Sequence, residues 1–492
     1  MKKIIYTLTA ILFSTGIYAQ NLVDALRYSD YRTTGTARSV AMGNAFGALG
    51  GDFTSLSINP AGLGLYRSGE FVFTPNINKS NVDGLYLDNT VSDSKYNFSL
   101  DNIGYVATIK PGTESSLVSL SFGVGYNRLK NYSMNMLVSG ANAQNSILTG
   151  FTNRVNDDYL APEEFDPYYE ALAYDTYLMD YDEENDEFFN DLTDQGYGQS
   201  QRKTTNRRGY INEYLFSLAA NFNHKFYVGA TIGIHDLYFK EGTDLYEFDA
   251  TNDIDYFNDL NFLTDLRTSG TGFNFKLGAI YKPTNDLRLG IAIHTPTFYR
   301  LHDTYENTML SNMTFDGKTE SFDAKSPYGE YDYDLETPLR AVFSAAYIIG
   351  KKALISVDYE LVDYATAKLR DGGNQNYQFT DENDDIAEAY KSVGNLHIGG
   401  EYRLTDNFSL RAGYENYPSA FNSYAFEDNQ LNSKADYSAV SAGLGIKQGN
   451  FFIDMAYKHS MNEEYNTLYG GSEFAKYDIA NDNFILTLGF KF

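Results

Sequence analysis

The sequence contains no cysteine and no tryptophan, and it is poor in basic residues. Without cysteine the chain has no disulfide, no thiol nucleophile, no cysteine-ligated metal centre and no lipid-bearing cysteine at an export cleavage site. Its 65 acidic residues outnumber the 38 basic ones, which gives a formal net charge of −27. This balance excludes a nucleic-acid-binding protein that depends on phosphate contacts, because such a protein needs a basic surface.

Long apolar runs are also missing beyond the N-terminus. The one apolar run, residues 4–17, follows the basic start Met1-Lys2-Lys3 and is shorter than the roughly 20 residues that a membrane helix needs. Residues 1–19 are therefore predicted to be a secretory signal peptide cut after Ala19, with a retained helical anchor as the alternative. No later stretch reaches 18 continuous apolar residues, so no membrane-spanning helix is predicted.

Aromatic and aliphatic residues are abundant and alternate with small or polar ones. In the last residues, Phe484, Leu488 and Phe492 share one parity, while Thr487 and Lys491 share the other. Alternate residues of a strand face opposite sides, so each such segment has one apolar face. The same alternation recurs at 118–127, 226–235, 273–280, 287–294, 396–403, 408–414 and 440–447. The second face is rich in Gly and Ser, which suits the interior of a membrane barrel better than the open surface of a sandwich, the alternative fold.

The pattern predicts fourteen strands joined by turns of alternating length. The strands are expected near 69–78, 96–109, 115–137, 210–223, 225–240, 266–282, 285–300, 336–349, 352–368, 389–403, 406–417, 435–448, 450–461 and 481–492. Tight joints such as Pro111-Gly112 and Gly350-Lys351 alternate with long ones at 79–95, 138–209, 241–265, 301–335, 369–388, 418–434 and 462–480. Short turns at one rim and long loops at the other are typical of outer-membrane barrels. We therefore predict an all-β fold in which residues 69–492 form a closed, 14-stranded antiparallel transmembrane β-barrel, with 138–209 as its longest extracellular loop.

Two finer features of the wall can be read from the residues. The apolar parity switches in the second strand between Leu100 and Ile103, which predicts a bulge near Asp101-Asn102 or, alternatively, a strand that starts at Asn102. Charged residues on the inward parity are expected to pair across the wall and to stiffen the barrel. They are Asp358, Glu360, Glu401, Arg403, Arg411, Lys447, Asp454 and Lys458.

Residues 20–68 precede the first strand and differ from the rest. They include the small-residue segment Met42-Gly43-Asn44-Ala45 and the triplet Asn59-Pro60-Ala61. The block is too polar to lie in lipid and too short to build a core alone. It is predicted to fold as an N-terminal plug inside the barrel lumen.

These N-terminal motifs, together with fourteen strands and a terminal Phe492, resemble the FadL-type family of outer-membrane transporters for long-chain fatty acids and other hydrophobic compounds. The resemblance implies a luminal hatch, an outer hydrophobic groove and release through a side opening beside a kinked third strand. Matching by motif would place Asn59, Pro60 and Ala61 at that opening. Gly123 and Gly125 are candidates for the kink, since glycine permits unusual backbone geometry, or they simply make room for the plug.

The acidic loop offers a second set of candidates. Residues 157–194 hold fifteen acidic side chains, nine aromatic ones and no Lys or Arg. Tyr168, Leu172 and Leu178 could form an apolar side that captures a hydrophobic ligand, and the alternative is a solvated, charge-repelled surface loop. The run 182–186 lacks the spacing of a defined calcium loop, so no metal site is predicted. No cofactor is predicted, and no nucleophile or catalytic motif nominates an enzyme.

The sequence thus predicts a passive transporter in the cell outer membrane of a Gram-negative bacterium. Long loops would capture a hydrophobic small molecule, which would pass to an apolar pocket near the hatch and leave sideways into outer-membrane lipid. The alternative is an interaction protein like the PorV-type barrels, which resemble the same family and act as shuttles with a secretion partner protein. The strand that ends in Phe492 is expected to contact the barrel-assembly machinery.

Overall fold

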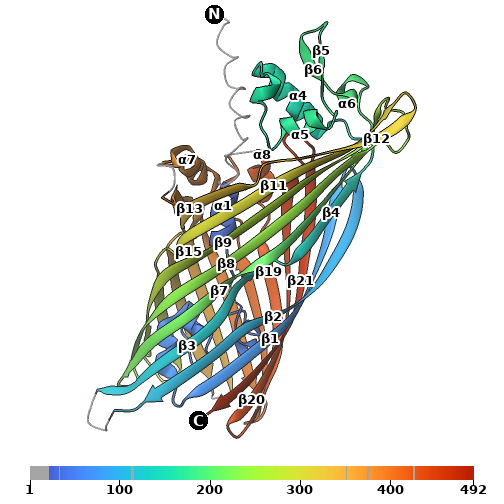
Figure 1. Ribbon diagram of the computed structural model, residues 1–492. Coiled ribbons are helices and arrows are strands. Elements are labelled where there is room, and N and C mark those ends of the chain that lie inside the picture. Colours follow the sequence, from blue (N-terminus) through green and yellow to red (C-terminus); the bar gives the residue numbers. More distant parts are fainter. Residues whose placement is uncertain (1–21, 33, 112–115, 351, 374–376, 425–426) are drawn as a thin grey trace, which may run out of the picture.

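The computed structural model describes residues 22–32, 34–111, 116–350, 352–373, 377–424 and 427–492. The predicted signal peptide and the turn residues Gly112 and Lys351 lie outside these ranges. Nearly all described strands belong to one antiparallel sheet that closes on itself, because β1 (Glu70–Tyr86) pairs with the last strand, β21 (Phe474–Lys491). Figure 1 shows the resulting tilted barrel, with the C-terminus at the rim of short turns.

The described part of the wall has the fourteen predicted strand positions, four of which are made of two consecutive segments. After β1 they are β2 (Asn89–Ile109), β3 (Leu117–Asn131) with β4 (Met134–Gly140), β7 (Ser200–Phe222), β8 (Phe226–Phe248), β9 (Phe257–Tyr281), β10 (Leu287–His294) with β11 (Phe298–Phe315), β13 (Gly329–Glu336) with β14 (Arg340–Ile349), β15 (Ala353–Asp363) with β16 (Lys368–Asp371), β17 (Ser392–Arg403), β18 (Phe408–Tyr417), β19 (Tyr437–Gln448), β20 (Phe451–Thr467) and β21. The hairpin strand β12 (Lys318–Lys325) pairs with the outer end of β11, and β5 (Asp180–Asp182) pairs only with β6 (Glu187–Phe189). The predicted fold class is confirmed.

The apolar parity of the strands faces outward. Phe484, Leu488 and Phe492 are exposed, whereas Ile485 and Thr487 on the other parity are buried. The same outward set continues around the wall with Phe71, Ile77, Phe122, Val124, Phe216, Leu218, Ile232, Ile234, Phe273, Phe275, Leu289, Ile291, Phe343, Ile355, Val357 and Ile453. A sandwich would bury this face, so the alternative fold is excluded. The exposed band suits the hydrocarbon core of a bilayer, with which side chains on the outside of a closed barrel can mix.

Leu277 of β9 belongs to this exposed apolar band, which we call the lipid-facing band. Its side chain is 63% exposed and lies opposite Ala230 and Ile293. Leu277→Arg should lower the free energy of unfolding in phospholipid vesicles by about 2–4 kcal/mol, because it places a cation in hydrocarbon. Equilibrium unfolding in urea measures the change. Tyr181→Arg, on the small β5–β6 sheet at the other end of the molecule, should leave the value unchanged, and an equal loss for both variants would contradict a lipid-facing Leu277.

The predicted long loops 79–95, 241–265, 301–335 and 462–480 were largely wrong, because most of their residues continue the strands. The β1–β2 hairpin turns at Leu87 and Asp88, both in the left-handed region with φ of 45° and 59°. Strands β7, β8, β9 and β11 run far past the roughly ten residues that cross a bilayer. The sequence criterion required an apolar residue at every second position. It missed these extensions because their apolar residues, such as Leu245, Leu260 and Met309, are more widely spaced and are buried in an apolar core at the long-loop rim.

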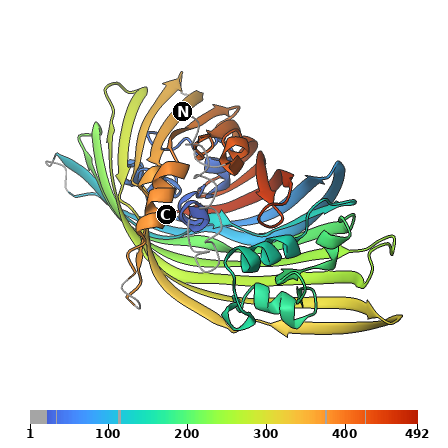
Figure 2. The same cartoon turned by 90° about the horizontal axis from the view of Figure 1, so that it is seen from above.

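The helices occur in two places, the N-terminal block and the long-loop rim of the barrel. The N-terminal block contains α1 (Leu22–Ser29), α2 (Ala37–Val40), α3 (Ser55–Ile58) and the 3-10 helix η1 (Pro60–Leu65). Figure 2 shows this blue segment inside the ring of strands. At the long-loop rim lie α4 (Ile147–Asp157), η2 (Pro162–Glu164), α5 (Glu170–Asp175), α6 (Asp191–Asp194), η3 (Tyr364–Thr366), α7 (Thr380–Ala389) and α8 (Glu427–Asn432). None of the helices in the described ranges is long and apolar enough to cross a membrane.

Candidate functional site

Small residues let the N-terminal block lie directly against the inside of the wall. Met42 and its neighbours Ala41 and Ala45 are fully buried. Gly43 has φ of +58°, and a Cβ there would lie 2.7 Å from the Tyr414 carbonyl oxygen. On the wall, a Cβ at Gly413 would lie 2.1 Å from the Gly43 nitrogen. Glycine on both sides therefore allows backbone-to-backbone contact that larger residues would prevent.

Ion pairs tie the block to one side of the wall. The Arg38 Nε lies 2.9 Å from Glu401 Oε2, and Arg411 lies 2.8 Å from the same carboxylate. Arg411 also contacts Asp454 at 2.5 Å. The pairing of inward charges across the wall was therefore predicted correctly at these positions. Two further predicted charges have partners outside the predicted set, since Lys458 pairs with Glu415 and Glu360 pairs with Arg340.

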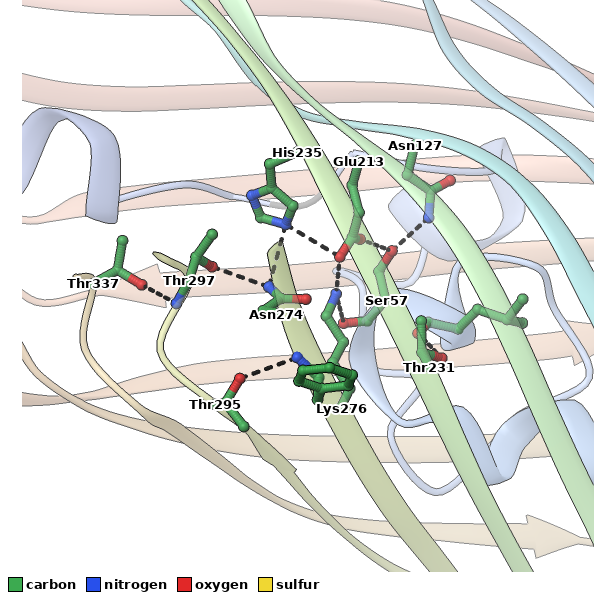
Figure 3. A network of polar contacts seen from close by, with 12 residues as sticks. Ser57, Asn127, Glu213, Thr231, His235, Asn274, Lys276, Thr295, Thr297 and Thr337 are labelled. Atoms are coloured by element: carbon green, nitrogen blue, oxygen red, sulfur yellow. Dashed lines mark hydrogen bonds and ion pairs between the residues drawn. The ribbon is translucent and has the colours of Figure 1, made fainter. Parts of the chain in front are cut away.

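A polar network fixes the block to the opposite side of the wall (Figure 3). Lys276 of β9 donates to Glu213 of β7 and, over 3.1 Å, to the Ser57 carbonyl oxygen. The Ser57 hydroxyl donates to Glu213 Oε2 at 2.7 Å and accepts from Asn127 Nδ2 at 2.6 Å. His235 Nε2 lies 3.3 Å from Glu213 Oε1. Glu213 and Lys276 are essentially inaccessible to solvent, so each charge depends on the other for compensation.

The triplet Asn59-Pro60-Ala61 lies against β8 and β9. Asn59 Nδ2 donates to the Gly47 carbonyl oxygen at 2.7 Å, and its Oδ1 accepts from the Ala61 nitrogen at 3.1 Å. A Cβ at Gly278 would lie 1.9 Å from Asn59 Oδ1, and one at Gly229 would lie 2.4 Å from the Pro60 carbonyl. The triplet therefore begins η1 and seats it on wall glycines.

The β2–β3 ladder stops partway up the wall. It runs from Ile109↔Leu120 to Asn102↔Asn127, and no β2–β4 ladder follows among the described residues. Each strand has an irregularity where the ladder ends. Asp101 is an extra residue of β2 relative to β1, which confirms the predicted bulge, and Leu129 is an extra residue of β3 relative to β7. The third wall position is then interrupted at residues 132–133 before β4 begins. We call the part of the wall between β2 and β4, beyond the end of this ladder, the wall separation.

Gly123 and Gly125 lie below the wall separation, inside the regular ladder. Both pair with β2 and with β7. A Cβ at Gly123 would lie 2.5 Å from Leu56 Cδ2, and one at Gly125 would lie 2.5 Å from Phe53 Cζ. In the structure the two glycines make room for the block, and the chain departs from regular pairing at residues 128–133 instead.

A cavity of about 450 Å³ connects the block with the wall separation. Ser99 and Asp101 of β2 line it, as do residues 129–134 of β3 and β4. Its apolar and aromatic lining comprises Leu22, Val23, Leu26, Val40, Leu129, Tyr132, Met134, Phe239, Tyr364, Tyr390, Tyr417, Ala420, Phe421, Tyr437, Ile479 and Ile485. Polar and charged side chains, among them Asp30, Arg32, Lys130 and Lys458, line the rest of the cavity. A concave space of this size that combines an apolar lining with polar groups able to orient a ligand is typical of small-molecule sites.

The sequence analysis expected an apolar pocket near the hatch but did not identify the residues that line it. Its lining comes from the N-terminal block, from β2–β4 and from β19–β21, which are hundreds of residues apart. The one available signal was the parity switch at Asp101, which marks the bulge beside the cavity.

The predicted capture residues lie in the segment 141–199 between β4 and β7, at the long-loop rim. We call this segment the cap. Leu172 and Leu178 are 2% and 3% exposed and belong to an apolar core shared with α4 and the outer ends of β8, β9 and β11. Tyr168 is half-buried and its ring lies 5.1 Å from that of Tyr305. In this conformation Leu172 and Leu178 hold the cap together and are covered from solvent.

The cap carries a cluster of acids that should make its packing depend on pH. Burial, followed by repulsion from Asp194, Asp180 and Asp255, raises the pKa of the Asp191 carboxyl to about 6. A raised carboxyl pKa contributes stability below the unfolded value near 4, and this stability is lost as pH rises through about 6. Hydrogen exchange of cap amides should therefore accelerate roughly tenfold between pH 4 and pH 7.5 after correction for intrinsic rates.

Asp191→Asn should reduce this pH dependence, and the remainder should come from other buried acids such as Glu247, whose carboxyl pKa is raised by burial to about 7. The exposed Glu163→Gln in the same cap is the matched control and should leave the dependence intact. Identical profiles for the two variants would rule out Asp191 as the responsible group.

Comparisons with known proteins bear on the whole barrel. The family model described as outer membrane protein transport protein (OMPP1/FadL/TodX) matches residues 211–477, more than half of the chain. A FadL homologue from Pseudomonas aeruginosa is similar in structure, with a TM-score of 0.55, 13% identity and coverage of 94% of this chain and 98% of that one. The toluene transporter TodX from Pseudomonas putida has a TM-score of 0.53, 13% identity and coverage of 94% and 99%. No curated protein matches the sequence.

Proposed function

Because the chain belongs to the OMPP1/FadL/TodX family of outer membrane transport proteins, we propose that it is a passive channel for hydrophobic small molecules with a lateral exit into the membrane. The observation that carries the proposal is the 450 Å³ cavity with its apolar and aromatic lining, which lies between the N-terminal block and the wall separation. Such a cavity would let a ligand remain in apolar surroundings between the outer rim and the lipid.

The N-terminal block acts as the hatch in this proposal. It fills the lumen below the cavity and is held to the wall by the Arg38–Glu401 pair and by the Ser57–Glu213–Lys276 network. A straight aqueous route to the short-turn rim would need the whole block to move. A ligand that leaves sideways needs only side-chain motion at the wall separation, since no ladder hydrogen bonds between β2 and β4 have to break in the described wall.

Apolar side chains on the outer face of the barrel beside the wall separation support a lateral exit. Phe98, on β2 just beyond the bulge, is 70% exposed and pairs with Ile77, which in turn pairs with Phe484. All three outward side chains belong to the lipid-facing band. A hydrophobic ligand that passes the wall separation would thus enter acyl chains without crossing bulk water, and transfer of its apolar surface is favourable by about 25 cal/mol per Å².

The proposed ligand class covers long-chain fatty acids and other hydrophobic compounds. The test is uptake by cells that lack their own transporter of this kind and carry either this protein or an empty vector. Labelled oleate and toluene serve as hydrophobic probes, and glycerol serves as a polar one. Faster uptake of at least one hydrophobic probe with unchanged glycerol entry supports the proposal, and equal uptake of all three probes in both strains overturns it.

A further inference from the structure

The periplasmic mouth of the barrel contains a second, larger cavity, on the other side of the N-terminal block. It measures about 830 Å³ and is lined on its inner side by apolar residues of the block, including Leu49 and Leu65. Wall residues such as Val118, Tyr227 and Leu354 continue this apolar lining. We call this space the vestibule.

Cations dominate the rim of the vestibule although the chain as a whole is strongly acidic. Seven lining residues are Arg or Lys, namely Arg38, Arg67, Lys110, Lys282, Arg288, Lys352 and Arg403, and only Glu401 is acidic. The neighbouring cavity of about 220 Å³ at the same mouth has five basic and five acidic lining residues. The imbalance is therefore specific to the vestibule and is not a general property of the short-turn rim.

Most of the vestibule cations lack an ion-pair partner among the residues that the structure describes. Glu401 already pairs with Arg38 and Arg411. The other six lining cations form no ion pair with the described residues. Confined like charges without partners attract counter-ions strongly, since clefts of one charge sign concentrate ligands of the opposite sign.

Among the six unpaired cations, Arg288 and Lys282 are half-buried and the other four are exposed. The Arg288 Nε is buried without a hydrogen-bond partner in the described structure, while its Nη1 donates to the Leu49 carbonyl oxygen. Burial and then the neighbouring Arg288 and Arg67 hold the pKa of the Lys282 ammonium, in the short turn after β9, below its usual value. An anion between these side chains would relieve their repulsion and give Arg288 Nε an acceptor.

We propose that the vestibule binds an amphiphile whose head group is an oxyanion, a phosphate or a carboxylate. The head group would lie among Arg67, Lys282 and Arg288, because guanidinium and ammonium groups form their strongest hydrogen bonds with such oxygens. The apolar tail would lie against Leu49 and Leu65 of the block. The site does not depend on the proposed transport activity, since it lies beyond the block from the other cavity.

The test uses the full-length protein in non-ionic detergent and hexyl phosphate as the soluble probe. The vestibule variant Arg67→Gln/Lys282→Gln removes two lining cations. The control variant Lys225→Gln/Lys447→Gln removes two cations of the same rim that do not line the vestibule. Calorimetric titration should give about tenfold weaker binding for the vestibule variant and less than about twofold for the control, as charge-assisted contacts are lost only in the first.

Uncharged hexanol should bind to the wild type and to both variants much more weakly than hexyl phosphate binds to the wild type. Native mass spectrometry with equal amounts of phosphatidylglycerol and phosphatidylcholine then identifies the source of the anion. If the wild type and the control variant retain phosphatidylglycerol preferentially and the vestibule variant does not, the result supports the site and assigns its anion to membrane lipid. Binding of hexyl phosphate without this lipid preference supports the site and assigns it to a soluble periplasmic amphiphile. Equal behaviour of the two variants, or binding of hexanol as tight as that of hexyl phosphate, overturns the proposal.

Discussion

Lys276→Met should lower the free energy of unfolding by about 3–5 kcal/mol, because it leaves the buried Glu213 carboxylate without its counter-charge. Both groups are inaccessible to solvent, and Lys276 is also a donor to the Ser57 carbonyl of the N-terminal block. The variant therefore loses an ion pair and a tether between block and wall. Equilibrium unfolding in urea in phospholipid vesicles, followed by tyrosine fluorescence because the chain has no tryptophan, measures the change.

Two further variants isolate the cause. Lys325→Met breaks the Lys325–Glu306 pair at 2.8 Å, whose lysine is 60% exposed, and should cost less than about 1 kcal/mol because water screens such pairs. Adding Glu213→Gln to Lys276→Met should recover at least half of the lost stability, since no charge is then left buried. If the double variant is no more stable than Lys276→Met, the buried charge is not the source of the loss.

Ser99→Trp should reduce uptake of the transported hydrophobic probe about tenfold, because the indole would obstruct the cavity through which the probe passes, and a tenfold effect corresponds to a free-energy cost of about 1.4 kcal/mol. Ser99 is buried, lines the 450 Å³ cavity and lies just beyond the last β2–β3 pair. An indole at this position would occupy both the end of the cavity and the wall separation. Initial uptake rates in the transporter-deficient strain, corrected for the amount of folded protein in the outer membrane, provide the measurement.

Ser94→Trp is the matched control for this experiment. Ser94 lies on the same strand but is exposed and does not line the cavity, so its replacement should leave uptake within about twofold of the wild type. Normal uptake by Ser99→Trp at wild-type abundance would place the exit elsewhere in the wall. Equal reductions by both variants would attribute the effect to barrel assembly.

The barrel could be predicted from sequence because its signals are local. In every strand the choice between lipid and lumen depends on the parity of single residues, as Phe484 and Thr487 illustrate, and neighbours in sequence are enough to read it. The bulge at Asp101 was predicted for the same reason, because one extra residue switches the parity of the strand. The extensions of β1, β8 and β11 were missed because their buried apolar residues, such as Val82, Leu245 and Met309, are too widely spaced to give an alternating pattern.

The candidate site was predicted only in outline. A plug was expected from the small residues around Gly43, and the wall glycines that face it explain why small residues are needed on both sides. The seating of Asn59 on β8 and β9 and the room that Gly123 makes for Leu56 follow from contacts between distant segments. The cations of the vestibule were equally hidden, since they come from the N-terminal block, from strand ends and from short turns that are far apart in sequence.

The sequence by itself determined a closed barrel of fourteen strands, its lipid-facing side and the presence of an N-terminal block, since each follows from periodicity or composition over a few residues. The tertiary structure alone decided where the β2–β3 ladder ends, which side chains enclose the two cavities and which acid compensates Lys276. These features depend on the register and curvature with which strands meet around the barrel, and such geometry is a property of the closed wall as a whole.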